Sequence, residues 1–239
     1  EEFPLYLSSA NFQTENGILN IVSTDTRRLA LSGTPVEDST EGSSSLLPMK
    51  GVKEVQRILG SLSPDAKIEI LYDDAQFYFK AGSLEFTVRR VESRFPPYEK
   101  ILPKGHSTCV ALDRGSLISA LERVDVIVRD YNRMVVLDIA AGSSLMMRGK
   151  APDFGQAMEE INAEITGNNL RIAVNSKFFM EALKVMREPQ VLLAFNGPSG
   201  HMAVRRIDSE GFLCLIAPIN LSEQELKMDE IDSSGDNGL

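Results

Sequence analysis

Residues 109–128 read CVALDRGSLISALERVDVIV, and this stretch decides the class of fold. Its first residues alternate in polarity as a strand does, Asp113 can cap a helix, and the remainder has the spacing of an amphipathic helix. The same order returns in RIAVNSKFFMEALKVMRE, residues 171–188, with Asn175 as the cap. SLLPMKGVKEVQRILGSL, residues 45–62, gives a third short strand and helix. The repetition predicts one α+β module that the chain uses more than once.

Strand signals fill most of the sequence between these helices. KIEILYDD, QFYFKAG and LEFTVRRV, within residues 67–91, alternate apolar and polar residues and predict an antiparallel meander. MVVLDIAA, SLMMRGKA, VLLAFNG, HMAVRRID and FLCLIAPI also read as strands. GQAMEEINAEITG, residues 155–167, is rich in Glu and Ala, but Ile161, Ala163 and Ile165 alternate, so we expect a strand. The prediction is α+β, with repeated antiparallel-sheet modules and helices on one face.

Negative charge is concentrated at the end of the chain. Residues 222–239 hold six acids and one lysine, a net of −5, which leaves −4 of the total −9 for residues 1–221. An acidic body does not bind nucleic acid by bulk attraction, so any contact with DNA needs local basic patches. The composition of residues 222–239 predicts a disordered tail. No stretch approaches the ~18 apolar residues of a membrane helix, which argues against a membrane protein.

Signatures of catalysis and of metal binding are lacking in the sequence. His106 and His201 are the only histidines, and neither has a cysteine or second histidine at ligand spacing. No GxGxxG, P-loop, GxSxG or CxxC motif occurs. We therefore expect no cofactor, no metal and no enzymatic activity; a hydrolase using Asp25 with Arg27 or Arg28 stays open as an alternative. The two distant cysteines, Cys109 and Cys214, favour a reducing cytosol.

Basic residues gather on one face of the first predicted helix. Lys50, Lys53 and Arg57 follow i, i+3 and i+7 spacing, opposite the apolar stripe of the helix. Such a face is most often simply solvated. The other two predicted helices carry Arg123 and, further on, Lys177 and Lys184. Because equivalent helices carry the cations while the body is acidic, the pattern also admits a nucleic-acid surface.

Four motifs together resemble one known family. STDTRRLAL, residues 23–31, resembles the ATDGHRLA segment of the bacterial DNA polymerase III beta subunit, the sliding clamp. VESRFPPYEKILP, residues 91–103, is similar to the V-x-G-R-F-P-D-Y-x-x-V-L-P connector of that family. YLSSANF, residues 6–12, looks like its Y-L-N-G-V-L-F strand, and LIAPINL, residues 215–221, looks like its terminal V-M-P-M-R-L. Their order and spacing match the second and third domains of the family.

The resemblance implies a domain organisation and a function. It implies that residues 1–104 form the middle domain, truncated at its N-terminal side, that residues 105–221 form the C-terminal domain, and that residues 222–239 are a further tail. It implies a non-enzymatic processivity factor of DNA replication, located in the cytoplasm at the nucleoid. In that family, head-to-tail homodimeric rings encircle duplex DNA without regard to sequence. The alternative is a related interaction module that binds partner peptides without encircling DNA.

The resemblance also implies two sets of site residues. The first set forms a groove between the middle and C-terminal domains, where the replicative polymerase, the clamp loader and repair proteins insert short Gln/Leu/Phe-type tails. It comprises Leu7, Thr24, Thr26, Arg28, Leu29, Pro96, Lys100, Ile101, Asn175, Phe178, Ser199, His201, Leu215, Ile216, Ala217, Pro218 and Ile219. The second set faces DNA. The resemblance supplies Tyr6, Lys50 and Arg57, and the helix faces add Lys53, Arg123, Lys177 and Lys184.

The sequence departs from the family pattern at several of these places. Thr26 and Arg27 replace Gly and His, so the turn is expected to differ and the groove mouth to be narrower. Asn132 replaces Phe, and Ala217 and Asn220 replace Met and Arg, which suggests another tail preference. We expect Asp25 to orient an arginine or the backbone of the turn. Within the tail, QELKM faintly resembles a clamp-binding motif, which gives the hypothesis that the tail occupies the groove.

Overall fold

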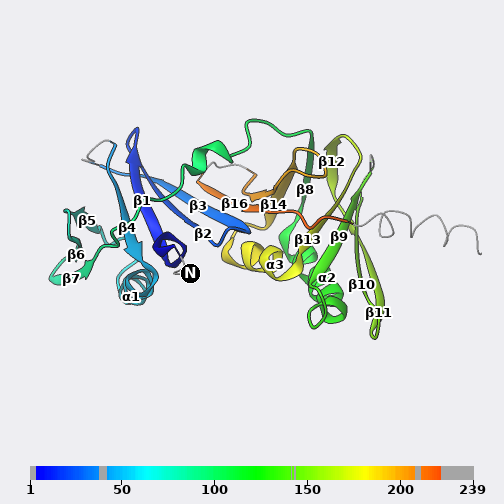
Figure 1. Cartoon of the computed structure of the whole chain (residues 1–239), viewed down its shortest axis with the longest axis horizontal. Helices are drawn as coiled ribbons and strands as arrows, with labels where there is room; N and C mark the ends of the chain where they lie inside the picture. The colour runs from blue at the N-terminus through cyan, green and yellow to red at the C-terminus, as the bar shows by residue number, and fades with distance from the viewer. Residues whose placement is uncertain (1–3, 38–41, 141, 143, 208–210, 222–239) are drawn as a thin grey trace, which may run out of the picture. The chain divides into compact units, whose positions relative to one another are not determined.

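The computed structural model describes residues 4–37, 42–140, 142, 144–207 and 211–221 (Figure 1). The predicted disorder of residues 222–239 lies outside the described residues and stays a prediction. The chain forms two compact units: Glu1–Leu102 with Ser209–Leu213 make the first, and Pro103–Asp208 with Cys214–Leu239 make the second.

The first unit combines a four-stranded and a three-stranded antiparallel sheet with one α-helix. The larger sheet has the order β3-β2-β1-β4, and the smaller has the order β5-β6-β7. The elements are η1 (Leu5–Ser8), β1 (Ser9–Glu15), β2 (Ile18–Thr24), β3 (Arg28–Pro35), β4 (Ser44–Pro48), α1 (Met49–Leu59), β5 (Glu69–Tyr72), β6 (Gln76–Ala81), β7 (Leu84–Arg89) and η2 (Tyr98–Lys100).

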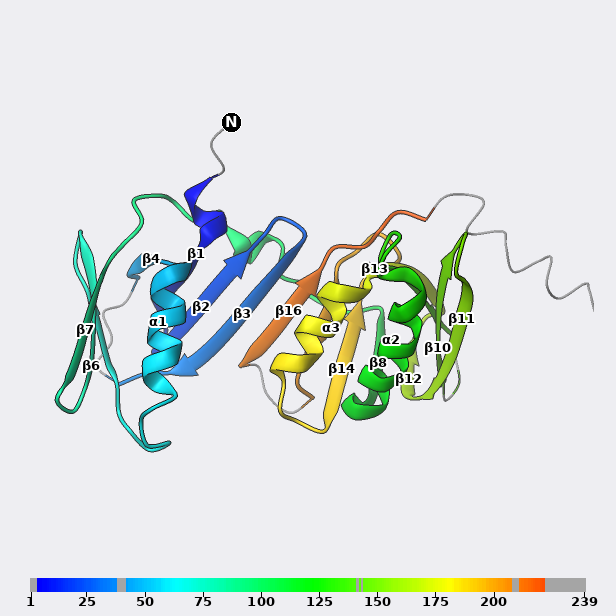
Figure 2. The ribbon, with the colours of Figure 1, turned by 90° about the horizontal axis from the view of Figure 1, so that it is seen from below.

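The core of the first unit lies between its sheets and α1. Phe12 on β1 meets Phe77 on β6 edge-to-face, with ring centroids 5.4 Å apart. Val52 and Val55 pack against this cluster from α1, which lies on one face of the larger sheet (Figure 2). The alternation predicted for the meander is confirmed, because Phe77 and Phe79 point inward while their neighbours do not.

The second unit also has two antiparallel sheets, with two helices. One sheet contains the order β12-β8-β14-β15, and the other is β11-β10-β9-β13. The elements are β8 (Thr108–Asp113), α2 (Arg114–Val128), β9 (Met134–Ile139), β10 (Ser144–Ala151), β11 (Gly155–Asn162), β12 (Glu164–Gly167), β13 (Leu170–Asn175), α3 (Ser176–Val185), β14 (Gln190–Phe195), β15 (Met202–Arg205) and β16 (Phe212–Ile216).

Helices α2 and α3 lie side by side (Figures 1 and 2) and are joined by polar contacts. The Ser176 hydroxyl at the start of α3 donates to the Asp125 carboxylate of α2. Arg114 Nε donates to the carbonyl of Glu188 at 2.7 Å, just beyond α3. On the sheet side of α2, Gly149 of β10 lets the helix approach closely, because a Cβ there would lie 2.6 Å from Val124 Cγ1.

The threefold repeat of strand, helix and following strands is confirmed as β4–α1–β5, β8–α2–β9 and β13–α3–β14. The two caps are also as predicted: Asp113 accepts from Ser116 N–H and Asn175 accepts from Lys177 and Phe178 N–H. Residues 155–167 are strand, as expected, but form two strands. β11 pairs with β10 and β12 pairs with β8, so the chain passes from one sheet to the other at this point.

Candidate functional site

The turn between β2 and β3 is held together by the side chains of Asp25 and Thr24. Asp25 Oδ1 accepts from the backbone N–H groups of Arg27 (3.1 Å) and Arg28 (3.0 Å), and its Oδ2 accepts from Arg28 Nε (2.9 Å). Thr24 Oγ1 donates to the Arg28 carbonyl at 2.7 Å. The expectation that Asp25 orients an arginine and the turn backbone is confirmed, and both of its carboxylate oxygens accept hydrogen bonds within the turn.

Thr26 occupies the one strained position of this turn. Its φ is +74°, in the left-handed region that β-branched residues rarely adopt. Its N–H donates to Thr24 Oγ1 at 3.1 Å, which helps to hold that conformation. The family pattern has glycine here, and glycine adopts this φ without steric cost. The predicted difference in the turn therefore lies in the side chain of Thr26 and in the strain that it causes. The φ at this position is one that the glycine of the family pattern adopts easily.

The other groove residues predicted in the first unit differ in accessibility. Leu29 is buried, with 3% of its surface exposed, whereas Ile101 is 46% exposed. Leu7 is half-buried, and Pro96 and Lys100 are exposed. A substitution of Leu29 therefore disturbs packing as well as any ligand contact.

Pro96 lines a cavity of about 440 Å³ within the first unit. The connector supplies one wall with Phe95 and Tyr98, and β4 supplies the other with Ser44 and Ser45. Burial, and then the charges of Glu99 and Glu15, raise the pKa of Tyr98 to about 12. The connector is thus anchored in its unit by the buried Tyr98 and leaves a hollow beside Pro96.

In the second unit, two of the predicted groove residues lie at the start of α3. Asn175 Oδ1 accepts from Lys177 N–H (3.0 Å) and Phe178 N–H (3.2 Å), so the cap fixes the half-buried Phe178 on the first turn of α3. The terminal segment comes to the same strand, since Ile219 N–H donates to the Ala173 carbonyl of β13 at 2.8 Å.

The remaining predicted groove residues of the second unit differ in how exposed they are. Leu215 and Ile216 are buried, and Ala217 and Pro218 are half-buried. Ser199 and His201 are exposed in the loop between β14 and β15.

On α1, the predicted DNA-facing residues are exposed. The side chain of Arg57 is 73% exposed and pairs with Glu54 at 3.0 Å. Lys50 and Lys53 are also exposed, and among the described residues neither forms an ion pair. Tyr6, half-buried on η1, packs edge-to-face on Phe95 with centroids 5.9 Å apart. The helix therefore presents two ammonium groups whose charge no described carboxylate offsets by contact.

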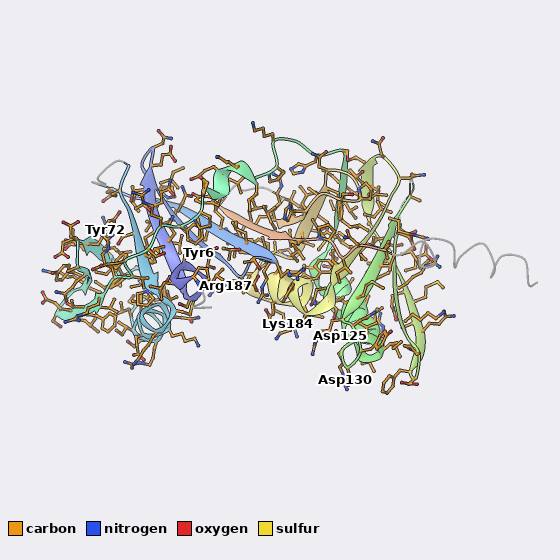
Figure 3. All side chains as sticks on the ribbon, in the orientation of Figure 1. Tyr6, Tyr72, Asp125, Asp130, Lys184 and Arg187 are labelled. Atoms are coloured by element: carbon orange, nitrogen blue, oxygen red, sulfur yellow. The ribbon has the colours of Figure 1, made fainter. Side chains whose placement is uncertain are left out.

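The predicted DNA-facing cations of α2 and α3 are in carboxylate contacts. Arg123 donates to both oxygens of Glu159, at 2.7 and 2.6 Å, and this pair lowers the pKa of Glu159. Lys184 of α3, labelled in Figure 3, pairs with Glu122 of α2 at 3.0 Å. Lys177 lies 4.0 Å from Glu181. These pairs reduce the positive potential of the second unit, so α1 is the stronger candidate surface for a polyanion.

A second hollow was not foreseen from the sequence. It has a volume of about 560 Å³ and lies on the face of the β11-β10-β9-β13 sheet that carries Arg148, Arg171 and Asp138. On each of the three strands, these half-buried charged residues alternate with buried neighbours, and this alternation is the signal that could have indicated the hollow. Within the described part of the chain no group of three metal-ligating side chains occurs, and no helix there has the length and apolarity to cross a membrane.

Comparison with known proteins accounts for nearly the whole described chain. Residues 1–97 match the family model "DNA polymerase III beta subunit, central domain", and residues 99–220 match "DNA polymerase III beta subunit, C-terminal domain". The beta sliding clamp of Staphylococcus epidermidis is 27% identical over 215 residues, which are 89% of this chain and 56% of that protein.

Solved structures of beta subunits superimpose on most of this chain. The beta subunit from Thermotoga maritima (28% identity) superimposes with a TM-score of 0.84 over 91% of this chain and 58% of its own. That from Pseudomonas aeruginosa (26% identity) gives 0.86 over 92% and 60%. The chain thus spans a little over half the length of these relatives. Because two domain models of one family match adjacent stretches that together cover most of the chain, the chain belongs to the DNA polymerase III beta subunit family, the bacterial sliding clamps.

Proposed function

We propose that this chain forms the middle and C-terminal domains of a sliding clamp, a processivity factor that encircles duplex DNA as a homodimeric ring and tethers the replicative polymerase. The match of both domain models to adjacent stretches of the chain carries this proposal. We place the domains at residues 1–104 and 105–221 and the protein in the cytoplasm. The role is one of binding: in the turn, Asp25 is engaged by two backbone amides and Arg28, as a structural residue is.

We further propose that residues of both units bind one partner tail carrying Gln, Leu and Phe. The turn offers the Arg28 guanidinium, which Asp25 holds in place at 2.9 Å. The cap at Asn175 fixes Phe178, a half-buried aromatic side chain of the size that anchors a peptide. Apolar anchors together with a few fixed polar groups are the usual means of recognising short peptides.

A double-mutant cycle tests the peptide site. The chain is titrated with a Gln-Leu-x-Leu-Phe peptide as wild type, Arg28→Ala, Phe178→Ala and the double variant, with Arg27→Ala as the matched control on the same turn. Loss of the aromatic anchor should cost about 2 kcal/mol of binding free energy. A coupling energy above about 0.5 kcal/mol places both residues on one ligand. Leu29 is avoided because it is buried.

A second ligand provides an independent check. A sliding clamp from Pseudomonas aeruginosa was crystallised with griselimycin. If this compound competes with the peptide for the chain, one site serves both. If Arg28→Ala and Phe178→Ala each bind the peptide as tightly as the wild type does, the peptide site is contradicted, even if griselimycin binds elsewhere.

The alternative is a peptide-binding module that does not encircle DNA, and the paired cations of α2 and α3 are the observation in its favour. Lys50→Gln with Lys53→Gln in the full-length protein separates the two. A clamp should lose salt-sensitive retention on circular duplex DNA while its peptide affinity stays the same. An unchanged retention supports the module.

A further inference from the structure

The cavity of about 560 Å³ on the outer sheet face of the second unit carries more cations than carboxylates. Arg148 and Arg171 approach the same carboxylate, Asp138: Arg148 Nε lies 3.0 Å from Oδ2, and Arg171 Nε contacts Oδ1. Lys150 also lines the cavity. The lining residues thus include three cations and one carboxylate, which is a net charge of +2. This charge favours an acidic ligand.

Part of the lining of the cavity is apolar. Met134 and Val136 of β9 lie between the charged side chains, and Met158 of β11 is 54% exposed at the far edge. A ligand that combines carboxylates with aliphatic side chains would match both features.

The C-terminal segment of the chain arrives at this sheet. Ile219 pairs with Ala173, Ala173 with Val136, Val136 with Arg148, and Arg148 with Met158, which places these five residues in one row across the strands. Directly paired residues point to the same face of a sheet. The last described residues therefore begin at the β13 border of the face that holds the cavity.

The following 18 residues have the composition that the cavity favours. Residues 222–239 carry six acids and one lysine, with Leu226, Met228 and Ile231 spaced among them. Neighbouring strands lie about 4.8 Å apart, so Arg148 is roughly 14 Å from Ile219 across the sheet. An extended chain spans about 3.3 Å per residue, so five residues beyond Ile219 suffice to reach it. Tethering also raises the effective concentration of the segment at the cavity.

We propose that the acidic segment 222–239 binds in cis over the cavity on the β11-β10-β9-β13 face, with its carboxylates at Arg148, Lys150 and Arg171 and its aliphatic side chains over Val136 and Met158. This site differs from the partner-peptide site proposed above and does not depend on it. Attraction at such partly exposed sites weakens with salt, because the Debye length falls from about 10 Å at 0.1 M to about 3 Å at 1 M.

Zero-length cross-linking of the full chain tests the placement. A carbodiimide joins carboxylates to amines in contact, so residues 222–239 should cross-link to Lys150 at low salt and much less at 1 M salt. The matched control is Lys104, an exposed lysine of the same unit that does not line the cavity. Cross-links from the segment to Lys104 as abundant as those to Lys150, or none to Lys150, would overturn the proposal.

Mixing isotopically light and heavy chains identifies the copy that supplies the segment. Cross-links within one chain support binding in cis. Cross-links only between light and heavy chains would overturn it and assign the cavity to the segment of a second copy.

Tryptic cleavage after Lys227 gives an independent readout. Binding should protect this bond, so Lys150→Glu should speed its cleavage about threefold to tenfold at low salt. Lys104→Glu should leave the rate unchanged. Equal rates in the wild type and Lys150→Glu at low salt would contradict the proposal, whatever the stability of the variant.

Discussion

Asp25 and Arg28 form an ion pair of 2.9 Å across the β2–β3 turn, and the same carboxylate accepts hydrogen bonds from two backbone amides. With side chains 43% and 29% exposed, the pair itself contributes little, whereas the amide bonds close the turn. Together with Thr24, Asp25 thus organises the turn of the STDTRRLAL segment.

Replacing Asp25 should therefore loosen the turn and release Arg28. We expect Asp25→Ala to lower the free energy of unfolding of the first unit by about 1–2 kcal/mol, since three acceptor contacts are lost. Asp25→Asn keeps the acceptor for the amides and should cost less than half as much. Urea unfolding measures both. Equal losses in the two variants would show that the charge matters more than the amide bonds.

Replacing Thr26 with glycine should stabilise the folded chain. At φ +74° a β-branched residue is strained, and glycine removes this strain at the expense of greater freedom in the unfolded chain. We expect Thr26→Gly to raise the free energy of unfolding by about 0.5–1 kcal/mol. Asn16→Gly serves as the control, because asparagine tolerates its φ of +53° and should gain little. A destabilised Thr26→Gly would contradict the argument.

The cap of α3 should contribute to stability and to the position of Phe178. Asn175→Ala removes the acceptor of two amides and should cost about 1 kcal/mol. Asn175→Asp preserves an acceptor at the helix N-terminus and should be nearly neutral. Hydrogen exchange at Lys177 and Phe178 reports on the cap directly. Unchanged exchange of these amides in Asn175→Ala would refute this assignment.

Gly149 should be intolerant of a side chain. A Cβ there would lie 2.6 Å from Val124 Cγ1 and 2.9 Å from Val128 Cγ1, so α2 must shift away from β10. Overpacking of this kind costs about 1–3 kcal/mol. Gly105→Ala, which meets no atom within 4 Å, is the control. Thermal unfolding should separate the two variants by several degrees, and coincident curves would disprove the close approach.

Tyr98 should make stability fall at high pH. Its folded pKa, raised to about 12 by burial, lies above the ordinary value of 10.0. The unfolded chain therefore loses the proton first, so this contribution is complete below pH 10 and is lost between pH 10 and 12. Absorbance titration should show a phenol ionising near pH 12 in the wild type and in Tyr131→Phe. Persistence of that step in Tyr98→Phe would contradict the assignment.

The sequence by itself determined the repeating module, both side-chain helix caps and the role of Asp25. Each of these depends on local chemistry: polarity periods, an acceptor at a helix start and a short carboxylate beside turn amides. The family resemblance added the groove residues and three DNA-facing residues, Tyr6, Lys50 and Arg57, and the helix faces added the other DNA-facing residues. All of these remain predictions.

Only the tertiary structure decided which side chains are buried and which distant strands share a face. It made Leu29 a buried residue, divided residues 155–167 between two sheets, and brought Gly211 back to the first unit, where its carbonyl accepts from Gly33 N–H at 3.0 Å. It also placed Asp138 between Arg148 and Arg171, and these three residues come from three different strands. Strand pairing between distant segments sets these relations, and the polarity pattern of a single strand does not specify its partner.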